Sequence, residues 1–174
     1  MDEENLCCNS MLHKKKKVLT FSLFLLTLLV IGLVNSIFME FGESSWYQSL
    51  QLPSFTPPDA VFLFFWTFLY ILLAFAGSIL YLAEKSMGRT LALCFFTLQL
   101  ILNLLWPFLF FCMKNPLFAA YEMIFLWLFT MLCMLYSYKI KPLAGWLLIP
   151  YGLWLTFAGF FNFSILFLGQ KTSY

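Results

Sequence analysis

The chain has 174 residues, of which 63% are hydrophobic, 21% aromatic and 10% charged, and its formal net charge is +2. Soluble domains carry about 25% charged residues, so this composition excludes an ordinary soluble enzyme or binding domain and is typical of a protein that crosses a membrane several times. A β-barrel does not fit, because the alternation of apolar and polar residues along barrel strands is missing.

Five long runs hold few or no charges: 18–38, 60–83, 90–113, 116–138 and 142–168. Each reaches the ~20 residues that cross ~30 Å of hydrocarbon as a helix. The sequence therefore predicts an all-α membrane protein, a five-helix transmembrane domain over residues 18–170. We expect a disordered basic tail over 1–17 and a short tail over 171–174.

Positive charges fall mainly on one side of these spans. That side holds Lys14 to Lys17, Lys85, Arg89, Lys139 and Lys141, and the other side holds Lys114 and Lys171. The positive-inside rule then places the N-terminus in the cytoplasm and the C-terminus outside. The four consecutive lysines directly precede an apolar helix, so we interpret them as an anchor on anionic lipid and expect the bilayer, not a nucleic acid, as their partner.

The first outside loop, residues 40–59, has the composition of a folded segment. Aromatic residues alternate there with prolines that fix backbone turns. We expect it to form a lid over a pocket in the bundle, although an aromatic belt on the lipid headgroups explains the same residues. The lid residues would be Trp46, Tyr47, Leu50, Pro53, Pro57 and Pro58.

The second and third spans each carry an unusual helical face. Trp66 and Tyr70 are one turn apart, and they could either line a cavity or fill the bundle. In the third span, Gln99, Asn103 and Trp106 share a face. These amides could join helices or contact a ligand. Pro107 lacks an N–H group and predicts a kink one turn beyond Asn103.

The fourth and fifth spans add an acid and a second polar stripe. Glu122 is the one acid well inside a span, and both a functional and a structural role remain open for it. In the fifth span Tyr151, Trp154 and Ala158 share a face that continues to Asn162, just after the helix-bending Pro150. The third span's combination of proline, aromatic ring and amide is thus repeated.

No residue pattern indicates conventional catalysis or metal binding. The five cysteines lack metal-ligand spacing, and no nucleophile with a base, phosphate loop or metal cluster is present. We expect no catalytic residue, no metal site and no resident cofactor. The single histidine, His13, lies outside the spans, so a haem inside the bundle would have no imidazole ligand.

The segment from Trp46 to Asn162, about two thirds of the chain, resembles the translocator protein or tryptophan-rich sensory protein family, which includes the peripheral benzodiazepine receptor. The loop W-Y-Q-S-L-Q-L-P-S-F-T-P-P is similar to the family's W-Y-x-x-L-x-K-P-x-W-x-P-P. The later matches are Trp66 with Leu69-Tyr70, Gln99, Leu102-Asn103, Trp106-Pro107, Glu122, Pro142-Leu143-Ala144, Leu147-Leu148, Pro150-Tyr151, Trp154 and Asn162.

This resemblance implies a membrane receptor for porphyrins, such as protoporphyrin IX or haem, and for related hydrophobic ligands, with a role in tetrapyrrole or lipid handling and stress sensing. Homodimers occur in the family, and its hosts are bacterial membranes and the mitochondrial outer membrane. The resemblance gives Trp66 and Trp154 the roles of pocket tryptophans. With the face neighbours, the expected ligand-binding set is Trp66, Tyr70, Gln99, Asn103, Trp106, Tyr151, Trp154 and Ala158.

Some positions depart from the family pattern. Leu52 replaces the loop lysine and Phe55 a loop tryptophan, which argues against an ion pair from the lid to a ligand carboxylate. Phe163 and Phe167 replace the tyrosine and arginine of a sterol consensus, which lowers the expectation of sterol binding. Alternative functions are a carrier for amphipathic molecules or sterols, light-dependent porphyrin degradation as in some bacterial members, and a bundle without a ligand.

Overall fold

The computed structural model describes residues 3–42 and 45–171 of the chain. Its elements are α1 (Glu3–Gly42), α2 (Ser45–Ser49), α3 (Asp59–Leu82), α4 (Met87–Pro107), the π-helix η1 (Phe108–Cys112), α5 (Pro116–Ile140) and α6 (Pro142–Lys171). Five segments are long and apolar enough to cross a membrane: Ser10–Glu40, Val61–Leu82, Met87–Cys112, Pro116–Ile140 and Pro142–Gly169. The predicted all-α, five-span fold is therefore confirmed.

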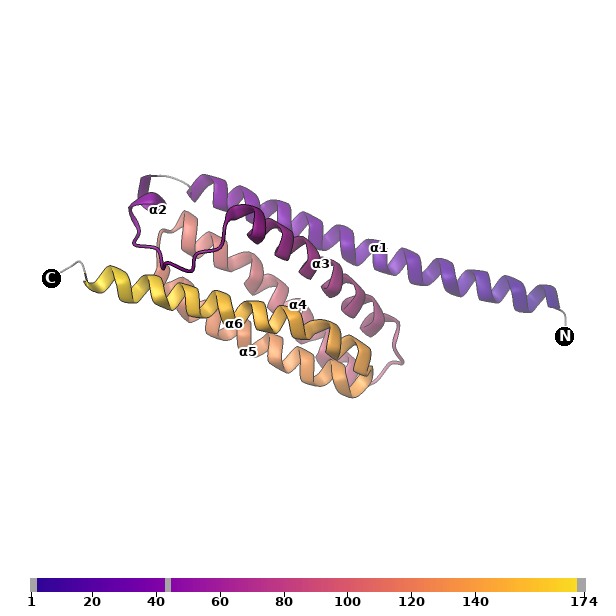
Figure 1. Cartoon of the computed structure of the whole chain (residues 1–174). Coiled ribbons are helices and arrows are strands. Elements are labelled where there is room, and N and C mark those ends of the chain that lie inside the picture. Colours follow the sequence, from indigo (N-terminus) through magenta and orange to yellow (C-terminus); the bar gives the residue numbers. More distant parts are fainter. Residues whose placement is uncertain (1–2, 43–44, 172–174) are drawn as a thin grey trace.

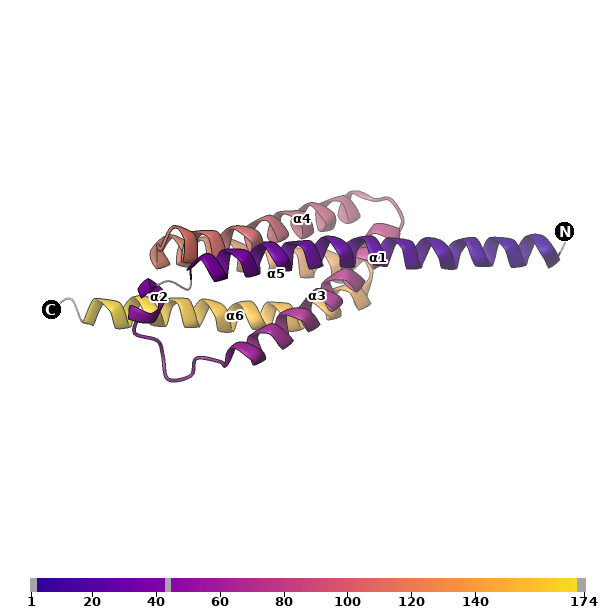
Figure 2. The same ribbon diagram turned by 90° about the horizontal axis from the view of Figure 1, so that it is seen from above.

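The five long helices close into a ring. Helix α1 packs on α3, α3 on α6, α6 on α5 and α5 on α4, and α4 with η1 returns to α1. Figures 1 and 2 show the helices running roughly side by side, with the ends of the chain at opposite ends of the bundle. An odd number of spans requires this separation of the two ends.

Helix α1 begins much earlier than its apolar span does. Residues 3–17, for which we expected disorder, continue the helix and project beyond the rest of the bundle (Figures 1 and 2). The segment contains no glycine or proline, and lysine is a good helix former, so nothing interrupts the helix that the span nucleates. Residues 1–2 of the expected N-terminal tail and residues 172–174 of the C-terminal tail lie outside the described residues.

Polar caps and close approaches fix the turns between helices. The Ser86 hydroxyl accepts a hydrogen bond from the Arg89 N–H at 3.1 Å, and the Arg89 guanidinium donates to the carbonyls of Leu80 and Tyr81 at 3.1 and 2.6 Å. The Asn115 side chain caps α5 by accepting from the Phe118 N–H at 3.1 Å. These contacts stabilise the α3–α4 turn and the start of α5 after η1.

Pro107 marks a change of helix type. Helix α4 ends at this residue and continues as η1, in which the Met113 N–H donates to the Phe108 carbonyl at 2.9 Å. The missing N–H of proline removes one α-helical hydrogen bond, and the wider turn that follows finds partners five residues back. Pro107, at which we expected a kink, thus lies where the α-helix gives way to a π-helical turn.

The core consists of two clusters along the bundle axis. The central cluster is built from α1, α3, α4, α5 and α6 around Leu73, Phe96 and Tyr151. A smaller cluster at the α2 end joins Phe110 and Ile165 to the first loop. Of the residues that the sequence analysis selected, the central cluster includes Tyr70, Tyr151 and Trp154, and the smaller cluster is contacted by Trp46, Tyr47 and Leu50.

Candidate functional site: a buried aromatic and amide cluster

Four helices contribute to one buried hydrogen-bond network near the middle of the bundle. The Asn103 Nδ2 of α4 donates to the Tyr151 hydroxyl of α6 at 3.1 Å. The Asn35 Nδ2 of α1 donates to Asn103 Oδ1 at 3.2 Å and to the Tyr70 hydroxyl of α3 at 3.3 Å. The Tyr70 hydroxyl lies 3.5 Å from Asn103 Oδ1, toward which it donates. Asn103 is therefore the shared member of the network.

The network is enclosed by apolar side chains. Asn103 is 3% exposed and Tyr151 is fully buried. Interhelical hydrogen bonds in membrane proteins contribute about 0.6 to 2 kcal/mol each, and a buried polar group without a partner costs about 1 to 3 kcal/mol. The four side chains thus help to fix how α1, α3, α4 and α6 are arranged.

Two indoles frame the network between α3 and α6. The Trp66 ring lies 5.4 Å from the Tyr70 ring, 6.4 Å from the Tyr151 ring and 6.3 Å from the Trp154 ring, measured between centroids. The Phe65 ring stacks on Trp154 at 5.0 Å with an interplanar angle of 12°. These rings contact one another directly, so the site is filled by its own side chains. We call the following six residues the aromatic–amide cluster: Asn35, Trp66, Tyr70, Asn103, Tyr151 and Trp154.

Trp106 lies beside this cluster and connects it to the first loop. Its ring stacks on Phe110 at 5.1 Å. The rings of Trp46 and Tyr47 in α2 contact the same Phe110 at 5.9 and 6.5 Å. Leu50 packs on the cluster around Phe110 as well. The first half of the loop is thus packed over η1.

The second half of the loop reaches α6. The Phe55 ring stacks on Phe160 at 5.4 Å and meets Phe157 and Phe161 edge to face. Pro53 is buried, while Pro57 is half-buried and Pro58 exposed just before α3. The loop therefore contacts both η1 and α6, which lie on different sides of the ring of helices.

Several buried polar atoms near the cluster have no hydrogen-bond partner among the described residues. Both side-chain oxygens of Glu122 and both side-chain polar atoms of Gln99 lack a partner. Glu122 is only 7% exposed. The indole N–H groups of Trp106 and Trp154 are also without an acceptor. Buried polar groups are nearly always paired, so each of these atoms has unused capacity for a bound polar group.

The two remaining polar-face residues of α6 have separate surroundings. Ala158 is half-buried and packs on the central cluster. Asn162 is fully buried, and its Nδ2 donates to the Pro116 carbonyl at 3.1 Å, which ties α6 to the start of α5. Asn162 thus belongs to the helix packing, outside the aromatic–amide cluster.

Asn35 is the member of the network that sequence reasoning missed. It is the single amide inside the apolar run 18–38, and that rarity is the signal that could have identified it. Its own helix offers no second polar residue at helical spacing on that face. The partners, Tyr70 and Asn103, are 35 and 68 residues away in the chain.

No group of three or more histidine, cysteine or acidic residues that could hold a metal ion occurs within the described ranges. The thiols of Cys94, Cys112 and Cys133 are free. The chemistry of the aromatic–amide cluster is therefore that of stacking surfaces, amides, phenols and one carboxyl group nearby.

Known proteins resemble this chain over most of its length. The family model described as the TspO/MBR family matches residues 23–168. The chain is 36% identical over 152 residues to the tryptophan-rich protein TspO of Chlorobaculum tepidum, a match that covers 87% of this chain and 96% of the relative. It is 37% identical over 147 residues to the protein of that name from Archaeoglobus fulgidus, covering 83% of this chain and 93% of the relative. It is 31% identical over 137 residues to the human translocator protein, covering 76% and 79% respectively.

Proposed function

Because this chain belongs to the TspO/MBR family of multi-pass membrane proteins, we propose that it is a receptor for porphyrins and related small hydrophobic molecules, bound at the aromatic–amide cluster. The observation that carries the proposal is that side chains of three helices meet around Tyr151: Trp66 of α3 contacts Tyr151 and Trp154 of α6, and Asn103 of α4 donates to the Tyr151 hydroxyl. Ligand sites in proteins combine such apolar walls with a few fixed polar groups.

The indole rings are suited to a flat guest. A porphyrin presents a planar aromatic face, and stacked aromatic pairs gain about 0.5 to 1.5 kcal/mol beyond the burial of their area. Phe65 already stacks on Trp154 in a nearly parallel arrangement. We expect a porphyrin to displace the half-exposed Phe65 ring, since the α3 and α6 side chains otherwise fill the site.

The unpartnered polar atoms supply the specific contacts. Gln99 and the indole N–H groups of Trp106 and Trp154 can bond to carboxylate or amide oxygens of a guest. The described residues place no histidine near the cluster, so binding depends on stacking and hydrogen bonds and accepts a porphyrin without a metal. The first loop, packed over η1, would move as a lid when the guest enters.

A fluorescence titration tests this assignment. Protoporphyrin IX added to the purified protein should quench tryptophan emission, and Trp66→Phe combined with Trp154→Phe should weaken the apparent affinity by about tenfold or more, since two stacking surfaces are reduced. The matched control is Trp146→Phe, because Trp146 is 60% exposed and lies at the start of α6. Equal affinity of wild type and double variant would remove the assignment.

A second candidate function is a carrier for an amphipathic molecule, favoured by Glu122. A carboxyl group without a partner inside a span is a common feature of transport pathways. Flux of protoporphyrin into liposomes should then exceed that of empty liposomes and fall with Glu122→Gln. If the protein still binds porphyrin but flux stays at the background level, the receptor function would be favoured over the carrier.

Chemical crosslinking in the same liposomes would test the homodimer that the family resemblance suggests.

A further inference from the structure

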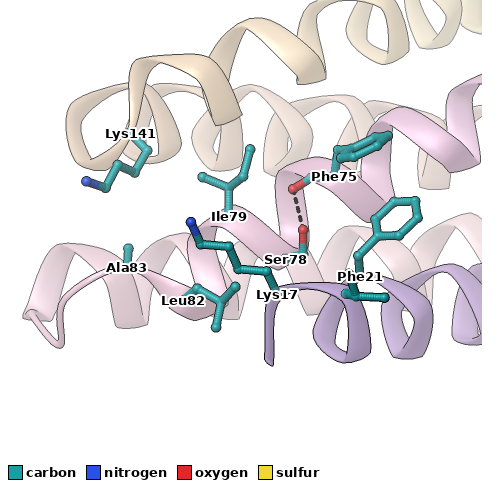
Figure 3. Close-up of a pocket in the computed structure, with 9 residues that line it drawn as sticks. Lys17, Phe21, Phe75, Ser78, Ile79, Leu82, Ala83 and Lys141 are labelled. Carbon is teal, nitrogen blue, oxygen red and sulfur yellow. Dashed lines mark hydrogen bonds between the residues drawn. The ribbon is translucent and has the colours of Figure 1, made fainter. Parts of the chain in front are cut away.

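A groove lies at the end of the bundle opposite the first loop. It has a volume of about 570 Å³ and lies between α1 and α3 and beside the α5–α6 turn (Figure 3). Volumes of about 300 to 1,000 Å³ are usual for sites that hold a small molecule. We call it the lysine groove, and its lining residues are Lys17, Val18, Phe21, Phe75, Ser78, Ile79, Leu82, Ala83 and Lys141.

The shape of the groove follows from the packing of the helices. Helix α1 packs on α3, and α3 supplies four of the lining residues, so α3 forms the floor of the groove. The groove is thus bounded by α1, by the end of α3 and by the α5–α6 turn.

The floor and inner wall are apolar. The rings of Phe21 and Phe75 stack at 4.3 Å and line the groove at the end away from Lys141 (Figure 3). Ser78 adds a hydroxyl, but this hydroxyl donates to the Phe75 carbonyl of its own helix at 2.9 Å. Ile79 and Leu82 complete the floor. Such a surface matches a hydrocarbon chain.

The rim carries two positive charges. Lys17 extends from α1 toward Ile79, and Lys141 extends from the turn before α6 with its ammonium group directed away from Ile79 (Figure 3). None of the described residues that line the groove is acidic. Glu84, which directly follows the lining residue Ala83 in the chain, is exposed in the α3–α4 turn. A cationic rim above an apolar floor is complementary to an amphiphile that has an anionic head group and an apolar tail.

We propose that the lysine groove binds one acidic phospholipid, with the phosphate between the ammonium groups of Lys17 and Lys141 and an acyl chain along Ile79 and Phe75. A free phosphate would leave the apolar floor unused. A zwitterionic lipid would bring a choline cation to a rim that has two cations and no acid. The site is separate from the aromatic–amide cluster and does not depend on its function.

Native mass spectrometry of the protein released from mixed micelles can measure this preference. The probes are dioleoylphosphatidylglycerol and dioleoylphosphatidylcholine at equal concentration. We expect the wild type to retain the phosphatidylglycerol selectively, and Lys17→Gln with Lys141→Gln to reduce this selectivity by roughly 25-fold, about fivefold for each ammonium lost.

The matched control is Lys85→Gln with Lys139→Gln, which removes two charges from the turns at the same end of the bundle without touching the groove. Selectivity within twofold of wild type is the expected result. An equal loss in both double variants would show general surface attraction and overturn the proposal. All four side chains are exposed, so folding should not be affected.

Two further measurements test whether the acyl chain of the lipid contributes to binding and whether free phosphate can replace the lipid. Ile79→Trp places an indole on the floor of the groove and should reduce retention of the phosphatidylglycerol although both lysines remain. Inorganic phosphate at millimolar concentration should not displace the lipid. Unchanged retention in Ile79→Trp, or displacement by phosphate alone, would overturn a site for a whole phospholipid.

Discussion

Asn103 shows how one side chain can organise the centre of the bundle. Its amide both donates and accepts, so it links Tyr151 of α6 to Asn35 of α1. Helical spacing along α4 was sufficient to predict that Asn103 and Gln99 face inward, and both are buried. The same spacing could not identify Asn35, because the partners that explain it lie on other helices.

Replacing Asn103 by Leu should destabilise the protein by about 1 to 3 kcal/mol, since the Asn35 amide and the Tyr151 hydroxyl would lose partners in an apolar interior. Thermal unfolding in detergent would measure the change. Thr67→Val is the control, because the exposed Thr67 hydroxyl donates to the Leu63 carbonyl of its own helix. Similar melting temperatures for both variants would contradict the role of the network.

Phe65→Ala should strengthen porphyrin binding by a few-fold to tenfold. The ring that stacks on Trp154 would be absent, so a guest would no longer have to displace it. The titration with protoporphyrin IX measures this change, and Phe68→Ala is a control on the same helix, exposed to a similar degree. Weaker binding by Phe65→Ala alone would mean that Phe65 is part of the ligand contact.

At the scale of helices, the sequence was a good guide to the spans and a poor guide to their ends. Charges and prolines bounded the four later spans to within a few residues of the observed helices. Helix α1 differs, because a charged segment that continues a stable helix loses little by remaining helical. The π-helical form of η1 could not be predicted, because Pro107 only implies a lost hydrogen bond and packing decides how the chain compensates.

The α5–α6 hairpin depends on a close approach at Gly145. A Cβ atom there would lie 2.8 Å from the Tyr138 Cα and 3.0 Å from the Tyr138 nitrogen. Gly145→Ala should therefore push α6 away from α5 and cost about 1 to 3 kcal/mol in unfolding measurements. In Gly159→Ala the new atom meets the Met123 side chain at an ordinary 3.5 Å, so this variant should change stability much less. Equal stability of the two would show that the hairpin can relax.

At the scale of the whole molecule, charge distribution and topology agree. The cationic residues of the N-terminal side and of the α3–α4 and α5–α6 turns gather at one end of the bundle (Figure 1), and the first loop lies at the other. The positive-inside rule could predict this division because it needs only the order of spans and charges. The mutual arrangement of the helices could not be predicted, since it depends on contacts such as the one between Asn35 and Asn103.

Reporter tags at the two termini test the predicted orientation. We expect protease added to the cytoplasmic face of membrane vesicles to remove an N-terminal tag and to spare a C-terminal one. Replacing Lys14 to Lys17 by Gln should produce a mixed population, because the strongest cytoplasmic signal would be lost. Cleavage of both tags from one face would contradict five spans, and the reversed pattern would contradict the predicted orientation.

The uneven burial of the six tryptophans has an optical consequence. Trp127 and Trp146 are turned outward, 40% and 60% exposed, whereas Trp154 is 9% exposed within the bundle. Phospholipids with brominated tails should quench the emission of the outward pair and leave the inner rings bright. The tryptophan emission of this protein would then separate into one fraction that reports on the surrounding lipid tails and another that reports on a ligand inside the bundle.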